Sequence, residues 1–404
     1  MEVTGLTYAL PDGRRVLNDV SFTLGEGVTA GLAGPNGAGR IALLRLIAGD
    51  LTPTSGKIAS KGGIGYLSRS GDSSSAERDR LSLEALLQGP DGVLLLDGPD
   101  EHLDVRGKEW LEDRFRSSRK TILLTSRDRQ LLANAASRII AVEEREVWVH
   151  EGGYATFADA RLARAPFGRE NETFRPEASG SPRSVLRALR RVLRDDRTRT
   201  RAGERALTGR GLRLPGLTTA FDLTVRLGDR IAICGADGPA KSLFRRLLDE
   251  SGRPDDAVPS FDGTVELGER VTPGSLTRDP ADAGLAGRSV ADLLTGLGHD
   301  DATAVLTRYG LEPARERRYE DLSDGERAGL NVLLLELAEV NLLLLDEPTG
   351  RLDPSGADTF QRCLRGFPGA VLAITGDRWL AGDFTRFLHF AADGQVREAT
   401  WGPE

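Results

Sequence analysis

The chain has 404 residues, with 54 lysines and arginines against 61 acids, a formal net charge of −7 and two cysteines. This length allows two or three domains, and the mild acidity argues against nucleic-acid binding by bulk charge. Two cysteines are too few for a disulfide framework, and no apolar run approaches the roughly 18 residues of a membrane span. The N-terminus lacks a signal-peptide pattern, so we expect a cytoplasmic protein.

The first half opens with strand-like segments between Val3 and Phe22, around a predicted hairpin turn at Pro11-Asp12-Gly13. An apolar run, Val28 to Leu32, leads into a glycine-rich loop and then a helical run, Ile41 to Ile47. Strand, glycine loop and helix in this order predict a P-loop, whose backbone amides bind phosphate. Its candidate phosphate-binding residues are Gly34, Asn36, Gly37, Gly39 and Arg40.

Two positions of this loop depart from the P-loop pattern. Arg40 stands where a P-loop has lysine, and Ile41 stands where a hydroxyl would bind Mg²⁺. Arginine keeps the charge but is longer and planar, so it need not reach the same phosphate oxygens. Isoleucine cannot bind the metal at all, which predicts impaired chemistry in this half.

Between the halves, a short helical stretch from Tyr154 to Arg164 is followed by a break through Pro182. The next stretch, Arg183 to Arg205, has nine arginines against three acids and a partly apolar face. Two interpretations stay open: a solvated helix packed on the folded halves, or a linker that faces RNA. The stretch contains no aromatic residue, so an RNA contact there would be to phosphate.

A second glycine loop opens the second half and keeps more of the pattern. Gly235, Gly238, Lys241 and Ser242 supply the loop, the phosphate-binding amine and the hydroxyl ligand of Mg²⁺. Ala240 replaces a glycine beside the lysine. A methyl group there can push the loop away from phosphate.

A carboxylate pair follows later in this half. The apolar run Leu342 to Leu345 ends in Asp346 and Glu347, as in a buried parallel strand that delivers two acids to its carboxyl end. Asp346 is the candidate ligand of a nucleotide-bound Mg²⁺, together with Ser242. Glu347 is the candidate catalytic residue, which would orient or deprotonate an attacking water.

The segment LSDGE lies upstream of that pair and contributes Ser323 and Gly325. It precedes a helical run predicted from Arg327 to Val340. Ser323 therefore suits a helix N-terminus that offers backbone amides to phosphate.

An internal repeat relates the two halves. The loop Gly34 to Arg40 matches Gly235 to Lys241 with an offset of 201 residues, and later positions match with an offset of 249. These later pairs are Ser74 with Ser323, Asp97 with Asp346, and Asp128 with Asp377. The first copy therefore lacks 48 residues that the second has between loop and serine, where apolar residues recur at helical spacing.

LSDGE, LLLLDEPT and the following RLD resemble the signature motif, Walker B motif and D-loop of ATP-binding cassette (ABC) ATPases. The whole chain resembles the ABC-F family of soluble tandem ATPases. This resemblance implies an α/β fold of two P-loop NTPase (ABC-type) cassettes joined by a helical linker, the first lacking its helical subdomain. The expected boundaries are 1–152 and 207–404 for the cassettes, 153–206 for the Arg-rich linker and about 285–322 for the helical subdomain.

The same resemblance assigns further positions and shows further losses. Tyr8 stands where ABC cassettes stack an aromatic on adenine, with ordinary packing as the alternative, and Leu212 matches it in the second half. Gly98 replaces the glutamate of the first Walker B motif, and the switch histidine is Arg127 in one half and Gly376 in the other. The signature glycine is missing around Ser74, and the expected glutamines are replaced near Arg69 and Arg278.

By resemblance, the cassettes of a monomer would face each other, with each ATP held by the Walker motifs of one half and the signature of the other. Known family members act on ribosomes and include translation and antibiotic-resistance factors. We expect ATP and Mg²⁺ to bind mainly at the second Walker site, with weak or absent hydrolysis to ADP and phosphate, and ribosome or rRNA contact through Arg183 to Arg205. The alternatives are a hydrolysis-defective regulator or scaffold with a protein partner and, less favoured, a soluble ATPase subunit of an exporter.

Overall fold

The computed structural model describes residues 1–37, 39–68, 76–164, 203–235, 239–250, 260–276, 285–295 and 299–399. The chain forms two compact units, one built on Met1–Pro166 and the other on Phe167–Arg351 and Gly356–Gly402. In the part of the chain described here, no helix is both long and apolar enough to cross a bilayer.

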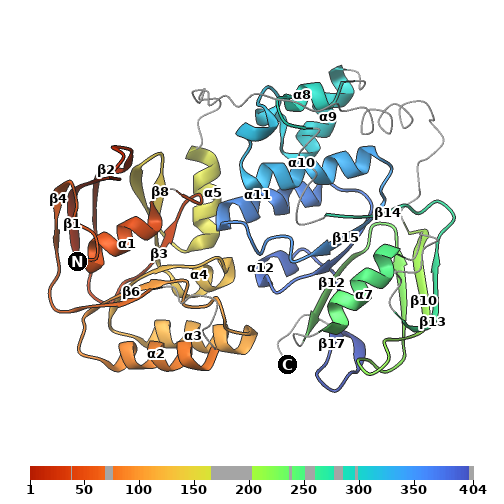
Figure 1. The fold of residues 1–404 in the computed structure, drawn as a ribbon, viewed down its shortest axis with the longest axis horizontal. Helices are drawn as coiled ribbons and strands as arrows, with labels where there is room; N and C mark the ends of the chain where they lie inside the picture. The colour runs from red at the N-terminus through yellow and green to blue at the C-terminus, as the bar shows by residue number, and fades with distance from the viewer. Residues whose placement is uncertain are drawn as a thin grey trace. The chain divides into compact units, whose positions relative to one another are not determined.

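The first unit contains two sheets (Figure 1). The smaller is antiparallel, in the order β2-β1-β4, and comprises Arg15–Thr23, Glu2–Ala9 and Ser55–Ala59. The larger has the order β5-β6-β7-β3-β8-β9 and comprises Ile64–Leu67, Val93–Asp97, Thr121–Thr125, Thr29–Ala33, Arg138–Glu143 and Glu146–Glu151. Its central strands β3, β6 and β7 are buried along their whole length, as parallel strands covered on both faces are.

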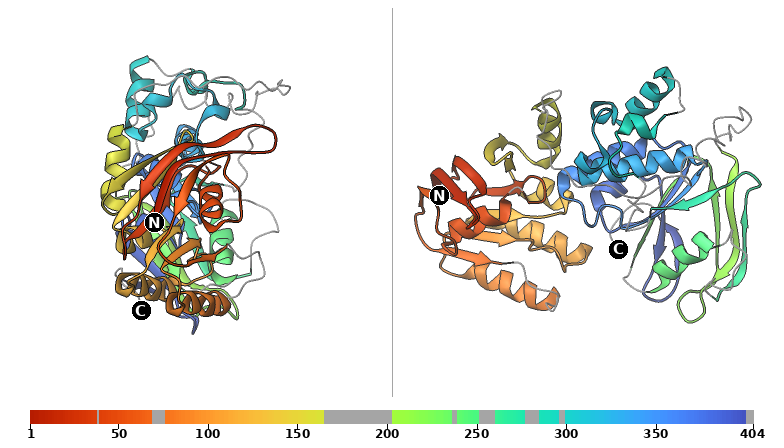
Figure 2. Two further views of the ribbon diagram at one scale, coloured as in Figure 1. Left: turned by 90° about the vertical axis from the view of Figure 1, so that its left-hand side faces the viewer. Right: turned by 45° about the horizontal axis from the view of Figure 1, so that its top comes forward.

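Five helices accompany these sheets: α1 Arg40–Ala48, α2 Ala76–Gln88, α3 Val105–Ser117, α4 Arg129–Ala135 and α5 Tyr154–Arg164. Helices α2 and α3 lie side by side (Figures 1 and 2), with the guanidinium of Arg80 stacked 4.6 Å from the ring of Trp110. The predicted helical stretch after Gly153 is confirmed as α5, and its residues Tyr154 and Phe157 are buried. The start of the expected linker therefore packs within the first unit.

The second unit repeats this architecture. Its antiparallel sheet has the order β11-β10-β13, comprising Phe221–Arg226, Arg205–Arg213 and Asp262–Leu267. Its larger sheet has the order β14-β15-β16-β12-β17-β18, comprising Pro273–Ser275, Leu342–Asp346, Ala370–Ile374, Arg230–Gly235, Arg386–Phe390 and Val396–Ala399. The strand order matches that of the first unit position for position, which is the spatial form of the internal repeat.

The helices of the second unit include the extra elements predicted between its loop and LSDGE. They are α7 Pro239–Glu250, α8 Val290–Leu293, α9 His299–Tyr309, η2 Glu312–Ala314, η3 Tyr319–Asp321, α10 Asp324–Leu337, α11 Pro354–Arg365 and α12 Arg378–Ala381. In the first unit, β5 ends at Leu67 and α2 begins at Ala76, so only residues 68–75 occupy the matching interval. That interval is too short for two helices, so the first cassette lacks the helical subdomain.

Several predicted helix bounds were wrong. The run predicted from Arg327 to Val340 is α10, which begins at Asp324 because Ser323 and Glu326 form a capping box. It ends at Leu337, and Glu339 has left-handed backbone with φ 64°. The Arg183 to Arg205 stretch lies outside the described residues up to position 202, and Arg205 begins strand β10 instead of ending a helix.

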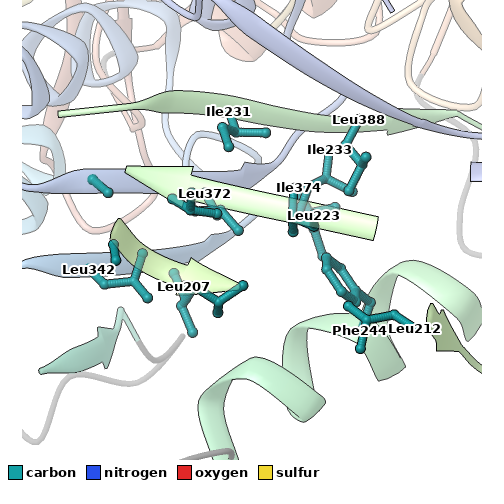
Figure 3. Close-up of a cluster of buried hydrophobic side chains, with 14 of the residues drawn as sticks. Leu207, Leu212, Leu223, Ile231, Ile233, Phe244, Leu342, Leu372, Ile374 and Leu388 are labelled. Carbon is teal, nitrogen blue, oxygen red and sulfur yellow. The ribbon is translucent and has the colours of Figure 1, made fainter. Parts of the chain in front are cut away.

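A buried apolar cluster fixes the position of α7 in the second unit (Figure 3). Phe244 on α7 packs against Phe221 and Phe390 with ring centroids 5.6 Å apart in both pairs. Leu342 and Leu372, from the neighbouring strands β15 and β16, belong to the same cluster. Since α7 carries Lys241 and Ser242, this packing fixes the backbone positions of those two residues.

Candidate nucleotide site

The glycine loop of the second unit joins β12 to α7. The ammonium of Lys241 donates a hydrogen bond to the carbonyl of Gly235 at 3.0 Å, across the loop. Gly235 has φ 110°, and a Cβ added to it would lie 2.1 Å from the carbonyl oxygen of Phe390. Gly235 is therefore required by the packing of β12 on β17, with or without a ligand. Gly238 lies outside the described residues.

The two loops differ in where their helices begin. In the first unit, Gly39 has φ 98° and α1 begins at the next residue, Arg40. The matching residue of the second unit is Ala240, and it already belongs to α7, which begins at Pro239. Alanine disfavours left-handed backbone and proline suits the first helical position, so the helix begins earlier and shortens the loop.

The first loop keeps its turns. An added Cβ on Gly34 would lie 2.2 Å from the carbonyl oxygen of Val142, whereas Gly37, with φ 81°, has open space around it. The guanidinium of Arg40 donates to the side-chain oxygen of Asn36 at 3.2 Å. The loop therefore presents an arginine held by its own asparagine.

Glu347 lies at the carboxyl end of β15, beside Asp346, and its backbone is left-handed with φ 44°. The matching residue of the first unit, Gly98, has φ 62°. Both units thus make the same turn, which costs a side-chain-bearing residue about 1–2 kcal/mol and costs glycine little. Glu347 is retained in spite of that strain.

The single backbone N–H of Gly376 donates a bifurcated hydrogen bond to both oxygens of the Glu347 carboxylate, at 3.0 and 3.2 Å. Burial raises the pKa of Glu347, and the bond from Gly376 offsets part of that shift. Sequence reasoning identified Gly376 only as a lost side chain. The structure shows that its amide holds the candidate catalytic carboxylate.

The two Walker B aspartates differ in what the next strand places opposite them. Asp97 on β6 pairs with Thr125 on β7, whose hydroxyl donates to the Asp97 carboxylate at 2.6 Å. Asp346 on β15 pairs in the same register with Ile374 on β16, which has no group to donate. Aligning the two copies of the repeat would have matched Thr125 with Ile374, but it would not have shown that Thr125 bonds to Asp97.

Mg²⁺ fits the second unit by the chemistry of its donors. Ser242 offers a hydroxyl and Asp346 a carboxylate, the oxygen ligands that Mg²⁺ takes while phosphate and water complete its shell. The first unit does not fit. Ile41, at the position of Ser242, is aliphatic and 49% exposed, and Asp97 is buried and bonded to Thr125.

Two residues of LSDGE, Ser323 and Gly325, stabilise α10 and its packing within the second unit. The Ser323 side chain accepts from the amide of Glu326, as the N-cap of α10. Gly325 lies so close to α11 that an added Cβ would meet the carbonyl oxygen of Gly356 at 2.3 Å. Packing alone therefore accounts for a serine and a glycine at these two positions.

The predicted match of Tyr8 with Leu212 was wrong. Leu212 on β10 pairs with Phe221, and Val20, the repeat partner of Phe221, pairs with Leu6, whereas Tyr8 pairs with Leu17. Tyr8 is half-buried against the first unit's core, while Leu212 is fully buried in that of the second. Of the other positions singled out in the sequence, Arg69, Ser74 and Arg278 lie outside the described residues.

Comparison with known proteins agrees with this architecture. Residues 17–164 match the sequence model of the ABC transporter family. An antibiotic resistance protein of Mycobacteroides abscessus is 33% identical, with 99% of this chain and 98% of the relative covered. The chain belongs to the ABC-F family. The alignment runs over 545 positions, so the relative contains segments that this ABC-F chain lacks.

Other relatives of this ABC-F chain are more distant. The tylosin resistance ATP-binding protein TlrC of Streptomyces fradiae is 26% identical over 93% of this chain and 94% of its own length. The energy-dependent translational throttle protein EttA of Escherichia coli K12 is 28% identical over 80% of this chain and 64% of its own length. Among solved structures, the RNase-L inhibitor has a TM-score of 0.62 at 16% identity, covering 98% and 89% of the two chains. That likeness shows the shared fold.

Proposed function

We propose that this ABC-F chain binds ATP with Mg²⁺ mainly at the loop of its second cassette, and that it hydrolyses ATP slowly or not at all. The observation that carries the proposal is the contrast between Glu347 and Gly98 in the same left-handed turn. A strained residue persists where function needs it, and glycine relieves the strain where it does not. Lys241, Ser242 and Asp346 complete the candidate set with Glu347, and the charges of Lys241 and Asp346 act on the Glu347 carboxylate.

Slow hydrolysis follows from two features of the same cassette. Position 376 is a glycine with no side chain to contact a phosphate, and its amide holds the Glu347 carboxylate. Ala240 draws the start of α7 into the loop, which removes amides from the phosphate-binding turn. Losing one charge-stabilising group in phosphoryl transfer costs on the order of 10³-fold in rate.

We further propose a cytoplasmic translation or antibiotic-resistance factor acting at the ribosome. TlrC is named for tylosin resistance and EttA for control of translation. In this proposal the cassettes span 1–152 and 207–404, the latter with a helical subdomain at about 285–322. The stretch Arg183 to Arg205, within the 153–206 linker, would contact rRNA phosphates.

Binding of a labelled, non-hydrolysable ATP analogue tests the nucleotide site. We expect Mg²⁺-dependent binding to wild type that Lys241→Ala removes. Absence of such binding in wild type would overturn the proposal and favour a scaffold with a protein partner. An ATPase rate like that of ordinary cassettes, abolished by Glu347→Gln, would overturn slow hydrolysis.

Ribosome co-sedimentation tests the partner. We expect the full chain to sediment with ribosomes in the presence of the analogue, and neutralising the arginines of 183–205 to weaken that binding and to reduce its dependence on salt concentration. A chain that stays in the supernatant at low salt, with analogue bound, would contradict action at the ribosome.

A further inference from the structure

The metal position of the first cassette is blocked at the loop. Ile41 occupies the second position of α1, where Ser242 stands in the second cassette. Its side chain is 49% exposed, so an aliphatic group faces outward where a hydroxyl would coordinate. No oxygen ligand is available from this residue.

The second candidate ligand, Asp97, is held by a hydrogen bond. The hydroxyl of Thr125 donates to one oxygen of the Asp97 carboxylate at 2.6 Å, and the Thr125 oxygen accepts from the amide of Gly98 at 3.0 Å. Thr125 therefore joins the aspartate to the turn that follows it. This bond orients the carboxylate and leaves its other acceptor sites in place, so the missing oxygen ligand of this half is the hydroxyl at position 41. The second cassette has Ile374 at the position of Thr125, which offers no hydroxyl.

Positive charge in the first cassette is supplied by side chains. Arg40 is held at 3.2 Å by Asn36, at the start of a nine-residue helix. Burial lowers the pKa of Arg40, while the carboxylates of Asp353 and Asp97 raise it and the guanidinium of Arg127 lowers it, so charges of both signs act on Arg40. Arginine stays charged in proteins, so this cation does not depend on metal supply.

We infer that the first cassette is a metal-free half. The chain holds one divalent cation, in its second cassette, and nucleotide phosphate at the first loop is neutralised by Arg40 instead of Mg²⁺. The location of the one cation rests on the proposed function, whereas the loss of the first metal site rests on Ile41.

Counting Mn²⁺ bound by the full chain tests this inference, with electron paramagnetic resonance as readout and excess non-hydrolysable ATP analogue present. We expect one Mn²⁺ per chain, lost in Ser242→Ala and kept in Asp97→Asn. Two Mn²⁺ per chain, one of them lost in Asp97→Asn, would overturn the inference. A wild-type count of zero would contradict the proposed second-cassette site while supporting the metal-free first cassette.

A gain-of-site variant tests the cause. Ile41→Ser gives the first cassette the hydroxyl that Ser242 supplies in the second, and we expect a second Mn²⁺. Ile41→Ala, which shortens the side chain without adding an oxygen, serves as matched control and should stay at one Mn²⁺. A folded Ile41→Ser protein that binds only one Mn²⁺ would overturn this account of the exclusion.

The role of Arg40 is tested in the Lys241→Ala variant, whose second loop is expected to have lost nucleotide binding. In Lys241→Ala protein with EDTA present, we expect residual binding of the labelled analogue, weakened at least about tenfold by Arg40→Ala and less by Arg40→Lys. Binding that requires Mg²⁺, that is absent in EDTA, or that Arg40→Ala leaves unchanged would overturn the assignment of charge to Arg40.

Discussion

At the scale of single residues, the repeat places a buried aspartate in the first unit where the second unit has a threonine, and ionising that aspartate is unfavourable. In the second unit the hydroxyl of Thr349 donates to the carboxylate of Asp377 at 2.8 Å. The first unit has Asp100 in place of the threonine, beside Asp128. Burial and the charge of Asp128 raise the pKa of Asp100 to about 6, with a partial offset from Lys108, which lies 3.1 Å from Asp128.

This exchange predicts a pH-dependent stability. The pKa of Asp100 in the folded protein, about 6, exceeds the usual 3.8. The contribution of protonated Asp100 to the free energy of unfolding is therefore fully present below pH 3.8 and is lost as the pH rises through 6. The ionised group then costs about 3 kcal/mol. We expect Asp100→Thr to raise the free energy of unfolding by about 1–3 kcal/mol at neutral pH and by little near pH 4. Urea unfolding across that pH range, with Asp100→Asn as a charge-removing control, measures it; equal gains at both ends would contradict the assignment.

The glycines of the first loop have separable roles. Gly34→Ala places a methyl against the Val142 carbonyl at 2.2 Å and should destabilise the first unit by several kcal/mol, on the order of other severe core changes. Gly37→Ala meets no atom within 4 Å, so it should cost only about 1 kcal/mol from its positive φ. Thermal unfolding of the two variants compares these costs, and similar values would show that close approach does not set the identity of Gly34.

The alanine of the second loop is predicted to weaken nucleotide binding. We expect Ala240→Gly to return the start of α7 to Lys241 and to tighten Mg²⁺-dependent binding of the ATP analogue roughly three- to tenfold, because more loop amides face phosphate. Ala304→Gly, at an exposed position in the middle of α9, is the control for a general effect of glycine. Weaker binding in Ala240→Gly would show that the early helix start favours the nucleotide.

At the scale of elements, α10 is positioned by its N-terminal residues. Gly325 and Gly329 are one turn apart, and added Cβ atoms on them would meet Gly356 of α11 at 2.3 Å and the sulfur of Cys363 at 2.2 Å. The helix of the signature motif thus lies against α11 backbone to backbone. Its N-cap, Ser323, fixes where the helix begins.

This packing predicts that Ser323→Ala costs about 1 kcal/mol through the lost cap, and that Gly325→Ala costs more because backbone cannot yield to the methyl. Thermal unfolding compares both with Ser289→Ala, which removes the equivalent capping box from the shorter helix α8. A Gly325→Ala protein as stable as wild type would leave a ligand as the reason for that glycine.

At the scale of the whole molecule, two units of one strand order have diverged in the chemistry at the ends of their strands. The first has Ile41 at the position of Ser242 and begins its helix α1 at Arg40, while the second has the candidate ligands Ser242 and Asp346 and begins α7 at Pro239. Hydrogen exchange should therefore show Mg²⁺-dependent protection by the ATP analogue in α7 and around β15. Equal Mg²⁺-dependent protection of α1 would argue against the division of labour between the units.

The sequence by itself determined the repeat, the strand, loop and helix order, and the candidate side chains, because apolar periodicity and glycine spacing are local properties. It misplaced the ends of α10, since capping and a left-handed Glu339 decide where that helix begins and ends. Only the tertiary structure decided that Thr125 holds Asp97, that the Gly376 amide holds Glu347, and that Asp100 is buried beside Asp128. Each of these joins residues nearly thirty positions apart through the register of parallel strands, which no local pattern specifies.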